Sequence, residues 1–154
     1  MNIKEFANKV IELYPQIIRA FKQYENNYLT RGEITLPQFW ALDYLDRNGN
    51  SKMNNLAKHL KISPPATTGL IDRLILQGLV VRKDDFHDRR MIWIELTVKG
   101  RGIIKSINKQ KTETLIKVFK NISPEDREHY LGILEQVVKI TASLQDTKPK
   151  SMKK

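Results

Sequence analysis

The residues of this chain best suited to binding chemistry form a run of three charges, Asp88-Arg89-Arg90, in a polar turn. The turn covers Lys83–Arg90, between the apolar segments Leu79–Arg82 and Met91–Leu96. Two short apolar segments joined by a polar turn predict a β-hairpin with a charged tip. Guanidinium groups suit narrow grooves of a nucleic acid, where negative potential is concentrated.

A helix that must hold this hairpin in place precedes it. Ser63 is a good N-cap and Pro64 fits the first helical position, while Gly78 provides the left-handed residue that ends a helix. A shorter helix, Met53–Leu60, comes before the turn at Lys61-Ile62, and either Ser51 or Asn54 is expected to cap it. We expect the later helix to bury Thr67, Leu70, Ile71 and Leu74.

Two helices joined by a tight turn and followed by a hairpin form a winged helix. The second helix of such a motif enters a major groove, and the hairpin tip reaches a neighbouring minor groove. The predicted fold class is therefore mainly α with a small β-hairpin wing. DNA binding is the leading hypothesis for the function.

The remaining elements frame this winged helix. Apolar residues spaced three and four apart predict a helix over 3–28, which Pro15 should kink or break. A loop follows at Thr30–Glu33, and Thr35 with Gln38 forms a capping box for the next helix. Further helices are expected from Thr97 to about Lys120 and from Ser123 onward. The last should bury an apolar stripe of Tyr130, Leu134, Val137, Thr141 and Leu144.

These elements predict one domain over 1–145. The winged helix-turn-helix covers about 35–100, and the helices at about 3–28 and 100–145 are left for dimerisation. A basic tail over 146–154 is expected to be disordered. Long amphipathic helices outside a complete winged helix pack most simply against a second copy of the chain.

The composition supports this interpretation and excludes others. The formal net charge of +10 suggests a polyanionic partner. Cysteine is absent from the 154 residues, which excludes disulfides, thiolate metal sites and thiol redox sensing. No catalytic motif, cofactor fingerprint or metal-ligand spacing is found, so the chain is not expected to be an enzyme. Without a signal peptide or an apolar run of membrane-spanning length, a cytoplasmic location is expected.

Nearly the whole chain resembles the MarR family of bacterial transcription regulators. The most specific residues are Leu74, Gly78-Leu79-Val80, Arg82, Asp88-Arg89-Arg90, Leu96-Thr97 and Gly100. The resemblance implies a homodimer that binds a pseudo-palindromic DNA operator. It also implies release by a small effector, commonly an aromatic anion.

The resemblance assigns Arg90 to the minor groove at the wing tip, with Asp88 orienting its guanidinium through a bidentate pair. The alternative is a solvated, charged hairpin tip. Arg89 and Lys83 are expected to meet phosphates.

On the recognition helix, the expected DNA-binding residues lie off the apolar stripe. Hydroxyls can bond base edges or phosphate, and apolar side chains can touch thymine methyl groups. Gly69 stands where relatives often carry a bulkier polar residue, which weakens direct base readout. Arg73 is either a phosphate clamp or part of a packing salt bridge, and Gln38 is expected near the DNA backbone. The helix set is Ser63, Pro65, Ala66, Thr68, Gly69 and Arg73.

An effector pocket is the remaining hypothesis. Arg19 matches the position where salicylate-binding relatives place an arginine, and Trp40 and Tyr44 lie one turn apart on the helix that follows. An arginine beside aromatic walls suits an aromatic carboxylate. The alternative is a surface charge at Arg19 with both aromatic side chains in a dimer core.

Together these residues predict a dimeric, cytoplasmic DNA-binding regulator, a repressor that a small effector releases, with no cofactor and no metal. Two alternatives stay open. One is a DNA-binding protein without an effector, and the other is a winged helix used for protein interaction or dimerisation. The charge of +10 and the arginines of the run Asp88-Arg89-Arg90 favour DNA over the interaction module.

Overall fold

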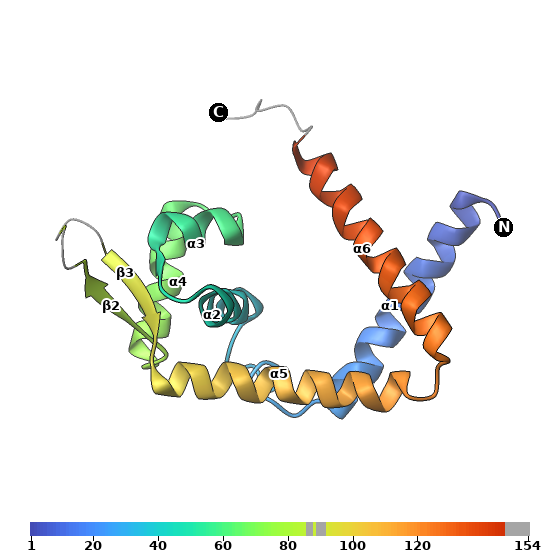
Figure 1. Cartoon of the computed structure of the whole chain (residues 1–154), viewed down its shortest axis with the longest axis horizontal. Helices are drawn as coiled ribbons and strands as arrows, with labels where there is room; N and C mark the ends of the chain where they lie inside the picture. The colour runs from blue at the N-terminus through green and yellow to red at the C-terminus, as the bar shows by residue number, and fades with distance from the viewer. Residues whose placement is uncertain (86–87, 89–91, 147–154) are drawn as a thin grey trace. The chain divides into compact units, whose positions relative to one another are not determined.

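The computed structural model describes residues 1–85, 88 and 92–146. It confirms the mainly α fold with a small winged helix-turn-helix sheet (Figure 1). The chain forms two compact units, Met1–Thr114 and Leu115–Lys154, and the winged helix lies within the first. In chain order the elements are α1 (Ile3–Tyr24), α2 (Leu36–Asn48), β1 (Ser51–Lys52), α3 (Met53–Leu60), α4 (Pro64–Leu76), β2 (Val80–Asp84), β3 (Ile92–Leu96), α5 (Val98–Phe119) and α6 (Pro124–Asp146).

The core of the first unit is built by α2, α3, α4, the sheet and the first half of α5. Figure 1 shows α2, α3 and α4 grouped beside the β2–β3 hairpin. Each element contributes aliphatic side chains that are at most 2% exposed, and this shared burial fixes α4 and the hairpin relative to each other. They include Leu42, Leu45, Leu56, Ile71, Leu74, Val80, Ile94, Ile104 and Ile107.

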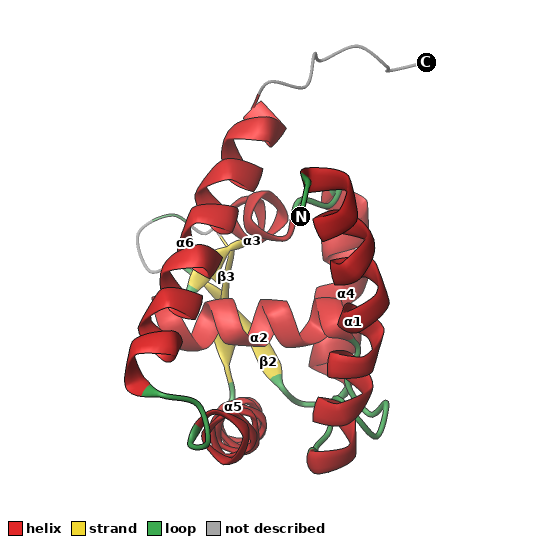
Figure 2. Ribbon diagram, turned by 90° about the vertical axis from the view of Figure 1, so that its right-hand side faces the viewer, coloured by secondary structure: helices red, strands yellow, loops and turns green. Residues whose placement is uncertain are grey.

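Three antiparallel strands in the order β1-β3-β2 form the sheet (yellow in Figure 2). In the register, Ser51 pairs with Ile94, and Arg82 also pairs with Ile94 from the other side. Because directly paired residues share a face, Arg82 lies on the core side of the sheet. On the opposite face, Lys52 and Lys83 both pair with Trp93.

Local capping explains where most helices begin. The Thr35 hydroxyl accepts from the Gln38 amide, and the Gln38 side chain accepts from the Thr35 amide, as predicted. Ser63 caps α4 through the Ala66 amide, and Ser123 accepts from the Asp126 amide at the start of α6. Gly78 has a φ of 71°, which confirms the predicted left-handed end of α4.

The first helix is shorter than predicted. It ends at Tyr24 instead of Tyr28, and the helix continues through Pro15 without ending there. The side chain of Asn27, 1% exposed, accepts from the amides of Leu29 and Thr30. These bonds stabilise a turn that competes with a further helical turn.

Two other boundaries also differ from the sequence prediction. The first wing strand extends to Asp84, so Lys83 belongs to a strand and not to the turn. Neither Ser51 nor Asn54 caps α3, because Lys52 occupies the N-cap, with no capping bond from its side chain, and Ser51 belongs to β1. The sequence analysis missed β1, whose two residues are too few to show an alternating pattern.

The terminal helices expose their apolar residues in the single chain. α1 has no buried residue, although Phe6, Val10 and Ile17 repeat on it at helical spacing. On α6 the predicted stripe is exposed as well, with Leu134 at 42% and Val137 at 49%. The single chain therefore does not bury this stripe, and its burial against a second copy stays a prediction. None of the helices in the described ranges is long and apolar enough to cross a membrane.

Candidate nucleic-acid interface

Helix α4 presents two different faces. Thr67, Leu70, Ile71 and Leu74 are buried, as the sequence predicted. The residues predicted to contact DNA lie on the other side of the helix, where all are exposed except the half-buried Gly69. They are Ser63, Pro65, Ala66, Thr68, Gly69 and Arg73.

The hydroxyl groups of Ser63 and Thr68 on this face can each make a further hydrogen bond, one as a donor and the other as an acceptor. Ser63 Oγ accepts from the Ala66 amide at 3.3 Å, so its O–H remains available as a donor. Thr68 Oγ1 donates to the carbonyl of Pro64 at 3.1 Å, so its lone pairs remain available as acceptors. A Cβ added at Gly69 would meet nothing within 4 Å, and the face is therefore open at its centre.

Arg73 is the exposed cation of α4. Within the part of the chain that the structure describes, its guanidinium makes no hydrogen bond or ion pair. The packing salt bridge considered from the sequence is therefore absent among these residues. A phosphate clamp is the role that this geometry supports.

An ion pair links α4 to the wing. Arg82 of β2 donates from Nη2 to Asp72 Oδ1 at 2.6 Å. Both side chains are nearly half exposed, so the pair contributes little stability. Its importance is geometric, because it joins the recognition helix to the strand that leads into the wing tip. Sequence reasoning missed this pair, although both residues stood in the segment it singled out.

The base of the wing is held by Asp85. Its Oδ2 accepts from the indole Nε1 of Trp93 at 2.7 Å, and its Oδ1 accepts from the backbone amide of Asp88 at 3.1 Å. The ammonium group of Lys52 lies 5.1 Å from the Trp93 ring centroid, within cation–π range. One carboxylate thus connects β3 to the loop that carries the predicted wing residues.

The predicted wing contacts have mixed outcomes. Lys83 is exposed but forms an ion pair with Glu95 of β3, so a phosphate contact has to compete with that carboxylate. Arg89 and Arg90 lie outside the described residues. The predicted ion pair between Asp88 and Arg90 therefore lies outside them too. Their DNA contacts stay predictions.

Gln38 has a structural role. Its side chain is 5% exposed, accepts from the Thr35 amide and donates from Nε2 to Gln77 Oε1 at 3.1 Å. Because its polar atoms are engaged inside the chain, the side chain is not available to phosphate. The placement of this side chain therefore does not support the predicted contact of Gln38 with the DNA backbone.

None of the three predicted effector residues lines the pockets near Lys99 and near Trp93. Arg19 is exposed on α1, and Trp40 is 46% exposed. The ring of Tyr44 packs instead against His59, with centroids 4.3 Å apart. Other residues line the pockets found near Lys99 and near Trp93. Among the described residues, no cluster of His, Asp and Glu is placed to hold a metal ion.

Comparison with known proteins identifies the type of regulator. A model of the MarR family matches residues 33–91. The HTH-type transcriptional regulator YsmB of Bacillus subtilis is 32% identical over 110 residues, covering 71% of this chain and 75% of that protein. The chain belongs to the MarR family.

Solved and characterised relatives agree with this membership. A MarR family protein from Bacillus stearothermophilus superposes with a TM-score of 0.73 at 28% identity, over 92% of this chain and 99% of the other. The homoprotocatechuate degradative operon repressor of Escherichia coli is 24% identical over 134 residues, 87% of this chain and 90% of that one. As a MarR family member, the chain is a DNA-binding transcriptional regulator and not an enzyme.

Proposed function

We propose that this MarR protein is a dimeric repressor whose two winged helices bind a pseudo-palindromic operator. The observation that carries the proposal is the exposed face of α4 beside a wing fixed to it by the Arg82–Asp72 ion pair. The helix offers Ser63 as a donor and Thr68 as an acceptor to base edges. Arg73 has no carboxylate partner among the described residues, which suits a phosphate contact.

Dimerisation through the terminal helices is supported by their exposed apolar residues. Monomeric proteins rarely leave large contiguous apolar patches in water, and such patches mark protein interfaces. On α1 the exposed side chains include Phe6, Val10 and Ile17. On α6 they include Leu134 and Val137. A second copy of the chain that covers these apolar residues would supply a second recognition helix. Two recognition helices related by a two-fold axis match a pseudo-palindromic operator.

The dimer is tested by sedimentation velocity of Val10→Glu, with Lys9→Glu on the same turn as the control. The wild type and Lys9→Glu should sediment as dimers, because Lys9 is an exposed charged residue paired with Glu12 and is not one of the apolar residues of α1. Val10→Glu should shift toward monomer and lose operator affinity. A Val10→Glu protein that remains a dimer with full affinity would remove α1 from the interface.

Operator binding is tested by selecting duplexes from a random library and footprinting the best one. Two protected half-sites about 10–10.5 base pairs apart, or a multiple of that, are expected from a two-fold dimer. Arg90→Ala should lose about 1–3 kcal/mol of operator binding. Asp88→Ala should also weaken binding, although it removes a negative charge. Tighter binding by Asp88→Ala would contradict the role of Asp88 in orienting Arg90.

The proposed effector is a small aromatic acid anchored by Arg19. The name of the Escherichia coli relative connects that repressor with the degradation of an aromatic acid. Arg19 is exposed on α1, the helix we assign to the dimer, so the pocket has to be completed there. Salicylate titrated against the operator complex should release the wild type and act at higher concentration on Arg19→Ala. Equal release of both proteins excludes Arg19 as the anchor.

A further inference from the structure

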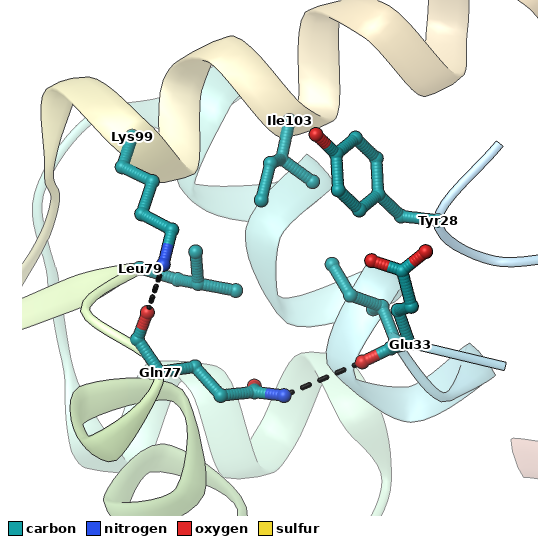
Figure 3. Close-up of a pocket in the computed structure, with 7 residues that line it drawn as sticks. Tyr28, Glu33, Gln77, Leu79, Lys99 and Ile103 are labelled. Atoms are coloured by element: carbon teal, nitrogen blue, oxygen red, sulfur yellow. Dashed lines mark hydrogen bonds between the residues drawn. The ribbon is translucent and has the colours of Figure 1, made fainter.

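A pocket of about 330 Å³ lies where the end of α4, the start of α5 and the loop before α2 meet (Figure 3). Its volume falls within the range of small-molecule sites. The DNA-binding role uses none of the residues that line it. The pocket is also separate from Arg19, Trp40 and Tyr44.

The inner wall of the pocket is apolar. Ile34 and Leu79 are each 2% exposed and Ile103 is 8% exposed, so this wall belongs to the core and is rigid. The ring of Tyr28 forms a side wall, and Figure 3 shows it beside Ile103. The guanidinium of Arg31 lies over one face of this ring, 4.8 Å from the ring centroid. An apolar side chain, above all a flat one, fits between these walls.

The rim carries two opposite charges from different elements. Lys99 of α5 donates from Nζ to the carbonyl of Gln77 at 2.8 Å, which leaves two of its three N–H groups available. Glu33, in the loop before α2, pairs through Oε1 with Arg31. Its Oε2 makes no hydrogen bond to any residue in the described ranges. Figure 3 shows the two charged side chains on different sides of the apolar wall.

From this arrangement we infer that the pocket binds a small zwitterion with an apolar side chain, of the aromatic or branched amino-acid class. Lys99 binds the carboxylate, Glu33 Oε2 accepts from the ammonium group, and the side chain covers Leu79 and Ile103. A simple anion can pair with Lys99 alone, and a simple cation can pair with Glu33 alone. Only a ligand that carries both charges is complementary to both ends of the rim.

Gln77 gives the pocket a connection to the recognition helix. It is the C-cap residue of α4, and its side chain donates to the Glu33 carbonyl at 3.3 Å while accepting from Gln38. A carboxylate shares the Lys99 ammonium group with the Gln77 carbonyl and, as the stronger acceptor, weakens the bond to that carbonyl. The bound zwitterion therefore loosens one anchor of α4 and weakens operator binding, a consequence that rests on the proposed function.

The binding test uses three probes and the intact protein without DNA. Isothermal titration compares L-phenylalanine with 3-phenylpropanoate, which lacks the ammonium group, and 2-phenylethylamine, which lacks the carboxylate. L-Phenylalanine should bind about tenfold more tightly than either partial analogue, as one charge-assisted hydrogen bond predicts. Equal binding of all three, tighter binding of 3-phenylpropanoate, or no binding of L-phenylalanine at millimolar concentration overturns the inference.

Two variants assign the charges. Lys99→Met should lower L-phenylalanine affinity about tenfold and leave 2-phenylethylamine unchanged, and Glu33→Gln should lower it similarly and leave 3-phenylpropanoate unchanged. Lys105→Met, on an exposed position of the same helix, is the control and should bind like the wild type. Loss of all probes to the same extent in a folded variant, checked by circular dichroism, overturns the charge assignment.

A separate measurement tests the connection to DNA. Saturating L-phenylalanine should weaken operator binding by at least about threefold in the wild type and have no effect on Lys99→Met. Selective binding without any change in operator affinity overturns the connection through Gln77. If the protein binds no operator at all, the proposed function fails while the three-probe titration still decides the pocket.

Discussion

Gly100, in the first turn of α5, lies where an added methyl group would meet backbone. A Cβ at this position would lie 2.0 Å from the carbonyl oxygen of Leu79 and 3.2 Å from Leu96 Cδ2. The same carbonyl accepts the hydrogen bond from the Thr97 amide at 3.1 Å. Gly100→Ala must therefore push Leu79, which lies between α4 and β2, away from the start of α5.

The expected size of this effect follows from three contributions. Overpacking costs about 1–3 kcal/mol. Loss of the Thr97–Leu79 bond adds about 1–3 kcal/mol because a partner is left unsatisfied. Alanine returns at most about 1 kcal/mol through its higher helix propensity. We expect the free energy of unfolding to fall by about 3 kcal/mol, which lowers the Tm by about 6–12 °C for a chain of this length.

Gly102 provides the matched control two residues further along α5. A Cβ there meets nothing within 4 Å, so Gly102→Ala should raise the free energy of unfolding by up to about 1 kcal/mol. Thermal unfolding is followed by circular dichroism at one protein concentration, because the proposed dimerisation would make the Tm concentration-dependent. If Gly100→Ala and Gly102→Ala shift the Tm equally, the close approach of Leu79 is not a constraint on the fold.

Three further predictions concern operator binding. Arg82→Ala should lower the free energy of unfolding by no more than about 1 kcal/mol, because the pair with Asp72 is exposed, yet it should weaken operator binding at least about tenfold. Urea unfolding measures the stability and fluorescence anisotropy measures operator affinity. Unchanged operator affinity would contradict the geometric role of the Arg82–Asp72 pair. Trp93→Phe removes the donor to Asp85 and should weaken operator binding about threefold to tenfold in the wild type. Trp93→Phe should weaken operator binding no further when it is combined with Arg90→Ala. If the losses of the two single variants add in the double variant, Trp93 does not act through the wing tip. Peroxide treatment should leave operator binding intact over minutes, since the chain has no cysteine, and a rapid thiol-reversible loss would argue against this.

Local signals in the sequence predicted the helix starts well. Thr35 with Gln38, Ser63 with Pro64, and Ser123 all cap the helices assigned to them, because a cap depends on residues within one turn. Burial of the inner face of α4 followed from its periodicity in the same way.

Interactions between distant residues could not be predicted in this way. β1 pairs with a strand about 40 residues later, and two residues carry no periodic signal. The end of α1 depends on a buried Asn27 whose turn competes with the helix. The bond between Trp93 and Asp85 required the register of the hairpin, which a turn containing several charges does not specify.

The effector residues show a different limit. A match of position placed Arg19 near Trp40 and Tyr44, but α1 packs no residue into the core of the single chain. Sequence spacing within one chain does not report on surfaces completed by a second copy. The pocket at Lys99 joins residues from three separate segments, and nothing in their spacing indicated it.

The most direct test of the central claim is the salt dependence of operator affinity, measured by fluorescence anisotropy on a selected duplex and a scrambled one. The wild type should prefer the selected duplex by at least about a thousandfold, and its affinity should fall linearly with salt on logarithmic axes. Arg73→Ala should reduce that slope by about one, and Arg47→Ala, at an exposed arginine of α2 that is paired with Asp43, should not. Equal affinity for the two duplexes, or a slope near zero, would contradict DNA recognition by α4 and the wing.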